Sequence, residues 1–161
     1  MPQIPPLVSV IILNYNGEKY LSNCLASVLK SQYVNFEVIL VDNASTDHSL
    51  KEAQETFGAD PRLKIVQNTQ NLGFSGGNNI GFGHSTGEYI VFLNNDTVVE
   101  ETWLSCLVDA MQSDLSIGLA QSKIISMDSD SIQNAGWLFS NYLVRKHSVG
   151  EKSRYNVEFE P

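Results

Sequence analysis

The sequence predicts an α/β fold in which helices cover a mostly parallel sheet. Apolar runs of strand length alternate with segments whose apolar residues recur at helical spacing, so the first half reads strand, helix, strand, helix, strand. The runs are nearly continuous in branched and aromatic side chains, which is typical of strands buried on both faces. The links between them are short, which favours parallel strands joined by right-handed crossovers.

Each element of the first half has its own signal in the sequence. Branched residues mark the strands, and Ser45, Thr46 and Asp47 are residues that commonly cap a helix. Gly58 and Pro61 favour the end of that helix. The expected elements are a strand at 7–13, a helix at 20–29, a strand at 36–41, a helix from the capping residues to about 57, and a strand at 63–66.

The second half begins with a glycine-rich segment, residues 68–83, which contains five of the 11 glycines. Its apolar side chains predict a structured loop followed by a short helix rather than a linker. The expected elements after it are a strand at 89–93 buried on both faces, a helix at 102–112, a strand at 117–125, a polar turn at 127–131, a hairpin or edge strands at 132–137 and 138–144, and little regular structure at 145–161.

The composition limits the kind of protein this can be. With 161 residues, 42% hydrophobic, the chain can bury the core of a single domain, expected to span residues 1–161. The net charge of -8 argues against general binding of nucleic acid and against a basic membrane-binding patch. Cys24 and Cys106 lie in helical apolar patterns and are expected to be buried thiols of a reduced, cytoplasmic protein. We see neither a signal peptide nor an apolar run of membrane-spanning length.

Polar side chains cluster after three of the predicted strands, at residues 14–16, 42–45 and 94–97. The carboxyl ends of parallel strands meet at one edge of a sheet, where α/β proteins bind ligands. Asp42 could accept hydrogen bonds from a ribose hydroxyl or a base N–H, and Asp96 could hold Mg²⁺ or Mn²⁺ together with phosphate oxygens. Either aspartate could instead cap the helix that follows it.

The common nucleotide-binding and catalytic motifs are missing. The first strand is followed by Asn14-Tyr15-Asn16-Gly17, which is neither the dinucleotide glycine fingerprint nor a phosphate-binding P-loop. The histidines are scattered, and no zinc motif or serine nucleophile elbow occurs. A nucleotide site without a phosphate-binding loop needs a cation to neutralise a diphosphate, and Asp96 is placed to hold it.

Four segments in order resemble the family 2 glycosyltransferases of the GT-A fold, with the closest likeness to the rhamnosyltransferase-like subgroup. These segments are residues 8–16, 41–47, 71–81 and 92–96. The resemblance implies a Rossmann-like three-layer α/β/α sandwich that transfers a sugar from a nucleotide-diphosphate sugar, such as a UDP- or dTDP-sugar. It implies a saccharide or lipid-linked acceptor and a function in cell-surface polysaccharide synthesis. The expected location is the cytoplasm or the inner face of the membrane, with peripheral membrane association and self-association left open.

The resemblance also implies roles for individual residues. Asn94, Asn95 and Asp96 occupy the D-x-D motif of the family, with Asn94 in place of the first aspartate, so Asp96 should carry most of the metal binding. Asn78 stands where other branches have an arginine. The residues implied in nucleotide-sugar binding are Asn14, Tyr15 and Asn16 near the nucleotide, Asp42, Asn43 and Ser45 at the base or ribose, Asn71 and Gly73 in the next loop, and Asn78, Asn94 and Asn95.

The C-terminal part departs from the family pattern. Family members continue further, and the additional part supplies the acceptor site and an acidic catalytic base. Nothing after Asp96 matches the base motif, and Glu151, Glu158 and Glu160 lie in unpatterned sequence. Residues 1–161 are therefore expected to be the donor-binding part of an enzyme. The alternatives are a catalytically incomplete nucleotide-sugar-binding module and a nucleotidyltransferase, although the latter should have a basic, glycine-rich loop after the first strand.

Overall fold

The structure is a computed structural model that describes residues 4–127, 129 and 131–134. The chain divides into two compact units, residues 1–105 and residues 106–161, which we describe separately. The predicted strand at 138–144 and the predicted irregular segment at 145–161 lie outside the described residues, as does most of the predicted strand at 132–137.

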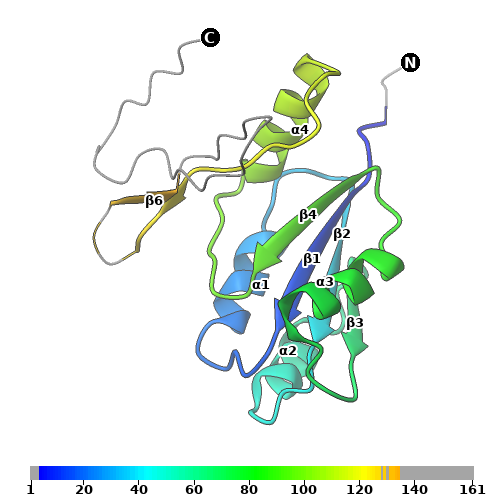
Figure 1. Ribbon diagram of the computed structural model, residues 1–161, viewed down its shortest axis with the longest axis vertical. Helices are drawn as coiled ribbons and strands as arrows, with labels where there is room; N and C mark the ends of the chain where they lie inside the picture. Colours follow the sequence, from blue (N-terminus) through cyan, green and yellow to red (C-terminus); the bar gives the residue numbers. More distant parts are fainter. Residues whose placement is uncertain (1–3, 128, 130, 135–161) are drawn as a thin grey trace, which may run out of the picture. The chain divides into compact units, whose positions relative to one another are not determined.

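The first unit contains a four-stranded parallel sheet with the strand order β3-β2-β1-β4. Helix α3 covers one face of this sheet, and α1 and α2 lie side by side on the other (Figure 1). The predicted α/β fold and its three layers are confirmed. The elements are β1 (Val8–Asn14), α1 (Leu21–Leu29), β2 (Phe36–Asp42), α2 (Ser49–Phe57), β3 (Leu63–Gln67), α3 (Gly73–His84) and β4 (Tyr89–Asn94).

The two central strands, β1 and β2, form the core as their apolar runs predict. Ile11, Ile39 and Val41 are fully buried under α3, where Ile80 packs against them. Glycines allow α3 to approach so closely, because a Cβ at Gly81 would overlap the side chain of Ile11. For the glycine-rich segment at residues 68–83 we expected a structured loop and only a short helix, and the length of that helix was wrong. The helix starts at residue 73 and continues for 12 residues, and close packing on the sheet offsets the low helix propensity of glycine.

Strand β4 is less covered than its sequence suggests. It pairs with β1 and has no other strand neighbour among the described residues. Its side chains are half-buried or exposed, and Phe92 is 54% exposed. The expectation of burial on both faces was wrong, because an apolar run fits an edge strand as well as a central one.

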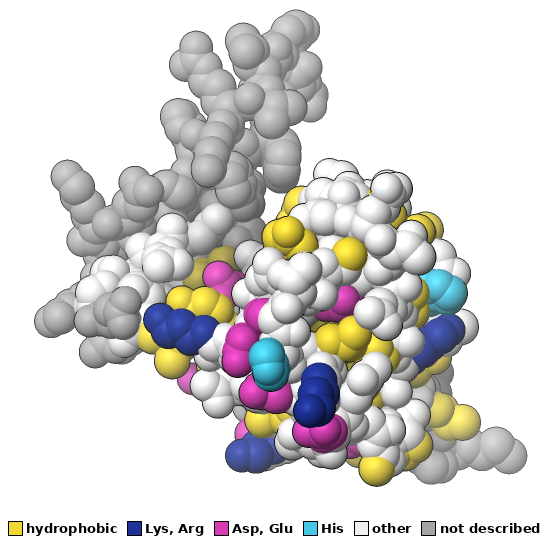
Figure 2. All heavy atoms as spheres, turned by 90° about the horizontal axis from the view of Figure 1, so that it is seen from below, with side chains coloured by type: hydrophobic (Ala, Val, Ile, Leu, Met, Phe, Trp, Pro, Cys, Tyr) yellow, Lys and Arg dark blue, Asp and Glu magenta, His cyan; other side chains and the backbone are white. Residues whose placement is uncertain are grey.

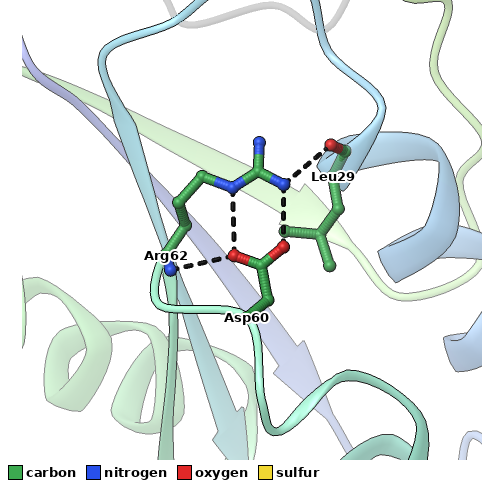
Figure 3. Close-up of polar contacts among 3 residues, drawn as sticks. All are labelled: Leu29, Asp60 and Arg62. Atoms are coloured by element: carbon green, nitrogen blue, oxygen red, sulfur yellow. Dashed lines mark hydrogen bonds and ion pairs between the residues drawn. The ribbon is translucent and has the colours of Figure 1, made fainter.

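The link between α2 and β3 is fixed by one ion pair. Arg62 donates two side-chain hydrogen bonds to Asp60 and a third to the carbonyl of Leu29, at the end of α1 (Figure 3). Gly58 ends α2 as predicted, but in a right-handed conformation rather than the left-handed one typical of glycine caps. This link therefore holds α1 and β3 together at the amino-terminal edge of the sheet.

The start of α2 differs from its prediction. The helix begins at Ser49, later than residues 45–47 suggested, and its N-cap is His48. Asp47 still accepts a hydrogen bond from the Ser49 N–H, so it satisfies one of the free donors at the helix start. Ser45 and Thr46 instead bond to the turn after β1, as described below.

The remaining elements are small. Helix α4 (Trp103–Ser113) crosses the boundary between the two units, and Trp103, Leu104 and Val108 are buried along it as predicted. In the second unit, β5 (Ile124–Ile125) and β6 (Ile132–Asn134) form an antiparallel pair around the predicted turn. The predicted strand at 117–125 is thus reduced to its last two residues. None of the described helices has the length and apolar character to cross a membrane.

The two cysteines differ in environment. Cys24 is buried in α1, whereas Cys106 is exposed on α4, so the expectation that both are buried was half wrong. Both are free thiols, in line with the absence of a disulfide framework in the sequence.

Candidate functional site

Three turns meet at the carboxyl ends of neighbouring strands. The sheet register pairs Asn14 with Asp42 and Leu13 with Asn94, so β1, β2 and β4 end at nearly the same level. We call the segments that follow the β1 turn (residues 14–18), the β2 turn (residues 42–48) and the β4 turn (residues 94–99). The three polar clusters predicted from the sequence therefore share one edge of the sheet.

Asn14 links all three turns. Its side chain is fully buried, and its amide nitrogen lies 3.1 Å from Asp42 Oδ1, 3.1 Å from Ser45 Oγ and 2.9 Å from Ser49 Oγ. Its amide oxygen accepts a hydrogen bond of 2.8 Å from Asn95 Nδ2. Because every polar atom of this buried amide is used within the protein, Asn14 holds the site together rather than offering a free group to a ligand.

The β1 and β2 turns are also joined by a reciprocal pair of bonds. The Asn16 N–H donates to Ser45 Oγ at 3.0 Å, and the Thr46 N–H donates to Asn16 Oδ1 at 2.8 Å. Both turns carry a residue with positive φ, Asn16 at 52° and Ala44 at 63°. An alanine in this conformation is strained, and such strain is held only where the surrounding bonds fix the backbone.

A second link lies further out along the same turns. Asp47 accepts hydrogen bonds from the Glu18 N–H at 2.9 Å and from the hydroxyl of Ser49. Although burial acts to raise it, these bonds from Ser49 and Glu18 lower the pKa of Asp47 below its ordinary value of 3.8. The carboxylate therefore stays charged and keeps the turns together.

Asp42 is covered in this arrangement. It has no exposed surface, and its two oxygens accept hydrogen bonds from the Asn14 amide at 3.1 Å and from the Ser45 N–H at 3.1 Å. Asp42 does not cap α2, which was the alternative interpretation from the sequence, because this helix begins further along the chain with His48 as its N-cap. Its contacts shape the β2 turn.

Asn43 connects the β2 turn to the loop before α3. Its amide nitrogen donates to Asn71 Oδ1 at 2.8 Å, and its amide oxygen accepts from Asn68 Nδ2 at 3.1 Å and from the Leu72 N–H at 3.0 Å. Asn71 also accepts from the Gly73 N–H, and Gly73 has a φ of 71°, which glycine adopts without strain. Asn71 and Gly73 thus lie beside Asn43, and their predicted contact with the nucleotide stays a prediction.

Two predicted residues stand apart from this network. Tyr15 is 49% exposed in the β1 turn and offers its ring to solvent. Asn78 is buried in α3 and donates to the carbonyl of Phe74, one turn earlier in the same helix. No hydrogen bond is described between Asn78 and the strand-end turns, so the structure does not bring it into the cluster.

The β4 turn is the most open part of the site. The side chains of Asn94 and Asp96 are exposed, and the carbonyl of Asn94 accepts from the Thr97 N–H at 3.2 Å and from Cys24 Sγ at 3.6 Å. Burial, with a further contribution from the charge of Asp96, raises the pKa of Cys24 to about 12. The thiol is therefore a neutral hydrogen-bond donor beneath the turn.

The donor set at the β4 turn suits a hard cation only in part. Among the described residues, no group of three or more His, Cys, Asp or Glu side chains could hold a metal ion by itself. Mg²⁺ and Mn²⁺ are often bound by one or two carboxylates, with phosphate oxygens and water as the other ligands. Asp96 fits a cation of this kind, one that arrives together with a diphosphate.

The charge of this end of the molecule supports the same view. Figure 2 looks from below Figure 1, at the end toward which the strand arrows point, and shows acidic side chains gathered near a histidine. Glu18, Asp47 and Asp96 lie on the three turns, while Lys19 lies over the ring of Tyr20. A diphosphate placed here would face negative charge unless a cation accompanied it.

The sequence reasoning missed residues that contribute to the site. Ser49 and Asn68 bond to Asn14 and Asn43, but each looks like an ordinary polar residue at a helix start or loop. Gly17 packs directly against the amides of Asn14 and Asn95, and a Cβ there would overlap both. A glycine within the polar cluster after β1 was the only signal for this close contact.

With this geometry in view, comparison with known proteins identifies the family. Residues 9–159 match the family described as Glycosyl transferase family 2. The chain belongs to this family. The prediction made from the four sequence segments is therefore confirmed, whereas the rhamnosyltransferase-like subgroup stays a prediction.

The relatives of this family 2 chain are longer proteins. It is 36% identical over 107 residues to an uncharacterized glycosyltransferase of Haemophilus influenzae, covering 66% of this chain and 33% of that protein. It is 34% identical to the glycosyltransferase GlyG of Streptococcus pneumoniae, covering 70% of this chain and 38% of GlyG. It is also 28% identical to the Escherichia coli glucosyltransferase WfgD, covering 93% of this chain and 54% of WfgD. The chain thus spans about a third of the first two relatives.

Solved structures of similar proteins support the GT-A fold. The mannosyltransferase PcManGT from Pyrobaculum calidifontis, in complex with GDP-Man and Mn²⁺, is 27% identical with a TM-score of 0.67 and covers 73% of this chain and 35% of its own. Staphylococcus aureus TarS in complex with UDP-GlcNAc is 26% identical with a TM-score of 0.61 and covers 73% of this chain and 40% of its own. The predicted fold class is confirmed.

Proposed function

We propose that this family 2 domain binds a nucleotide-diphosphate sugar at the β1, β2 and β4 turns and supports transfer of the sugar to a saccharide or lipid-linked acceptor. The observation that carries the proposal is the convergence of three polar turns at one sheet edge, joined through Asn14. Both solved neighbours described above contain a nucleotide sugar, and the name of WfgD specifies a UDP-Glc donor and a diphosphoundecaprenol-linked acceptor. Within the proposed UDP- or dTDP-sugars, the names of TarS and WfgD support a UDP-sugar as donor, whereas PcManGT holds GDP-Man.

We assign two different roles to the predicted site residues according to how exposed they are. Exposed residues of the turns contact the nucleotide and the sugar, whereas Asp42, Asn43 and Ser45 are buried or half-buried and orient the β2 turn against the base or ribose. The exposed residues proposed to contact the donor are Tyr15, Asn16, Asn71, Gly73 and Asn94.

Asp96 is the proposed ligand of a divalent cation, Mg²⁺ or Mn²⁺. When bound, such a cation neutralises the diphosphate and stabilises it as a leaving group. The exposure of Asp96 and the Mn²⁺ in the PcManGT complex support this assignment. The residues of this chain contribute by holding the cation and by orienting the nucleotide, and no described side chain is assigned as catalytic base.

The proposed setting is cell-surface polysaccharide synthesis at the cytoplasmic side of the membrane. The diphosphoundecaprenol-linked acceptor named for WfgD supports this setting, because a long apolar lipid chain partitions into a membrane. We further propose that residues 1–161 form one donor-binding domain.

Calorimetry with UDP, dTDP and GDP, each with and without Mn²⁺, tests the donor and metal assignments. We expect binding of UDP or dTDP that Mn²⁺ strengthens, and we expect Asp96→Ala to lose the effect of Mn²⁺. Asp109→Ala is a matched control, because Asp109 is an exposed aspartate on α4 outside the three turns. Undiminished metal-dependent binding by Asp96→Ala would overturn the metal role.

A second candidate is a nucleotide-sugar-binding module without transfer activity. It is favoured by the observation that the polar side chains of Asn14 and Asp42 are used in hydrogen bonds that build the turns. Incubation with a UDP- or dTDP-sugar, with and without a lipid-linked acceptor, separates the two candidates. Release of the nucleoside diphosphate above background would eliminate the module, whereas tight binding without turnover would favour it.

A further inference from the structure

Asn94, Asn95 and Asp96 differ in their exposure to solvent within the β4 turn. Asn94 and Asp96 are exposed, whereas Asn95 between them is half-buried. The amide nitrogen of Asn95 donates a hydrogen bond of 2.8 Å to the side chain of Asn14 at the end of β1. The middle residue therefore points into the protein while its neighbours face solvent.

The partner of Asn95 makes this bond costly to lose. Asn14 is fully buried, and in the described part of the chain its amide oxygen takes its hydrogen bond from Asn95. Without that donor a buried carbonyl oxygen would remain unpaired, which is a larger penalty than the loss of an exposed hydrogen bond. Gly17 packs against both amides, and the absence of a side chain there leaves room for the pair.

The ends of the β4 turn are held from another element. In α1, Cys24 donates to the carbonyl of Asn94, and Ser27 Oγ accepts a hydrogen bond of 3.2 Å from the Val99 N–H. These bonds fix the backbone on either side of Asp96. Among the described side chains of the β4 turn, only that of Asn95 forms a hydrogen bond with the end of β1.

We propose that Asn95 is a positioning residue that holds Asp96 at a fixed place relative to the ends of β1 and β2. Asn14 completes the connection, because the same amide bonds to Asp42 and Ser45 of the β2 turn. Asp96 is thereby kept at one position relative to the β2 turn, which is proposed to orient the base or ribose. This inference rests on the proposed function, and it gives Asn95 a role through Asp96 rather than a contact with the donor.

The test compares UDP affinity with and without Mn²⁺ in the wild-type chain, Asn95→Ala, Asp96→Ala and the double variant. We expect Asn95→Ala to reduce the Mn²⁺ enhancement of UDP affinity by about tenfold, as the loss of one buried hydrogen bond implies. Its affinity for UDP without metal should stay unchanged. The double variant should match Asp96→Ala, because Asn95 acts only through Asp96.

Val98→Ala is the matched control, since Val98 is exposed in the same turn and its side chain contributes no described hydrogen bond. It should retain the wild-type enhancement. Equal loss of affinity with and without Mn²⁺ in Asn95→Ala would overturn the proposal, because that result indicates a general loss of structure. A wild-type enhancement in Asn95→Ala, or additive effects of the two substitutions, would overturn it as well.

A measurement without nucleotide separates this proposal from the proposed function. Hydrogen–deuterium exchange of residues 96–99 should be faster in Asn95→Ala than in the wild-type chain and unchanged in Val98→Ala. If the wild-type chain bound none of the three nucleotides, the proposed function would fail, and faster exchange would still support the anchoring of the turn. Unchanged exchange in Asn95→Ala would overturn the anchoring whatever the nucleotide result.

Discussion

The β1 and β2 turns and the β4 turn of this chain are built in different ways. In the β1 and β2 turns, polar side chains bond to the other turn, as Asn14 does to the Asp42 carboxylate and Asn16 to the Thr46 N–H. In the β4 turn, Asn94 and Asp96 face solvent, and Asn95 alone is tied to the end of β1. The first two turns are therefore set before any ligand arrives, while the third leaves oxygen atoms free to hold a cation. Substitutions in the two regions should consequently differ in kind.

The largest effect on stability is expected for Asn14→Ala. This change removes a fully buried amide and leaves several neighbours without partners, so the free energy of unfolding should fall by about 3 kcal/mol. Urea denaturation followed by circular dichroism measures it. Asn79→Ala, at an exposed position on α3, should change stability by less than about 0.5 kcal/mol. Equal stability of the two variants would show that the network around Asn14 does not stabilise the fold.

A smaller loss is expected for Gly17→Ala, which tests the contact between the two regions. The added methyl group would overlap the amides of Asn14 and Asn95, and overpacking of this kind costs about 2 kcal/mol. Gly83→Ala is the matched control, because a Cβ at Gly83 has no neighbour within 4 Å. In helix α3 that change should stabilise the chain by about 0.5 kcal/mol. Losses of the same size at both glycines would contradict the tight contact at Gly17.

The stability that Asp47 contributes to the β2 turn should depend on pH. Because the folded pKa of Asp47 lies below its ordinary value of 3.8, its contribution is fully present above that pH. The contribution is lost as the pH falls through the folded pKa. We therefore expect Asp47→Asn to be less stable than wild type at neutral pH, with a difference that narrows below pH 3.8. Denaturation curves of both proteins between neutral pH and strong acid measure this, and a constant difference would contradict it.

The smallest effect is expected for Asp96→Ala. The carboxylate is exposed and accepts no described hydrogen bond, so its removal should change the free energy of unfolding by less than about 0.5 kcal/mol. The same urea denaturation measures it. A loss as large as that of Asn14→Ala would mean that the β4 turn is built like the other two, and the contrast between the regions would not hold.

Much of the fold could be predicted because its signals are local. The apolar runs of β1 and β2, the helical spacing in α1 and the polar clusters after the strands are visible in short stretches of sequence. The order of these elements and the short links imply parallel pairing. The exposure of β4 could not be predicted from its local sequence, because an apolar run does not show whether a strand has one neighbouring strand or two.

Part of the candidate site could likewise be predicted from the sequence, and part could not. Asp96 and Asp42 were identifiable because carboxylates at strand ends are informative by position. The distinction between Asn94, Asn95 and Asp96 was not, since exposure alternates along the turn only once Asn95 has Asn14 as its partner. That contact joins residues 81 positions apart in the chain.

By itself, the sequence determined the α/β class, the family resemblance and the edge of the sheet where polar residues gather. These properties follow from periodicity and from residue types within short segments. Only the tertiary structure decided which of those residues are buried links and which are exposed, because hydrogen bonds between distant turns depend on strand register. It also decided that the glycines of α3 serve close packing, since Gly81 lies against Ile11 of β1 only in the folded chain.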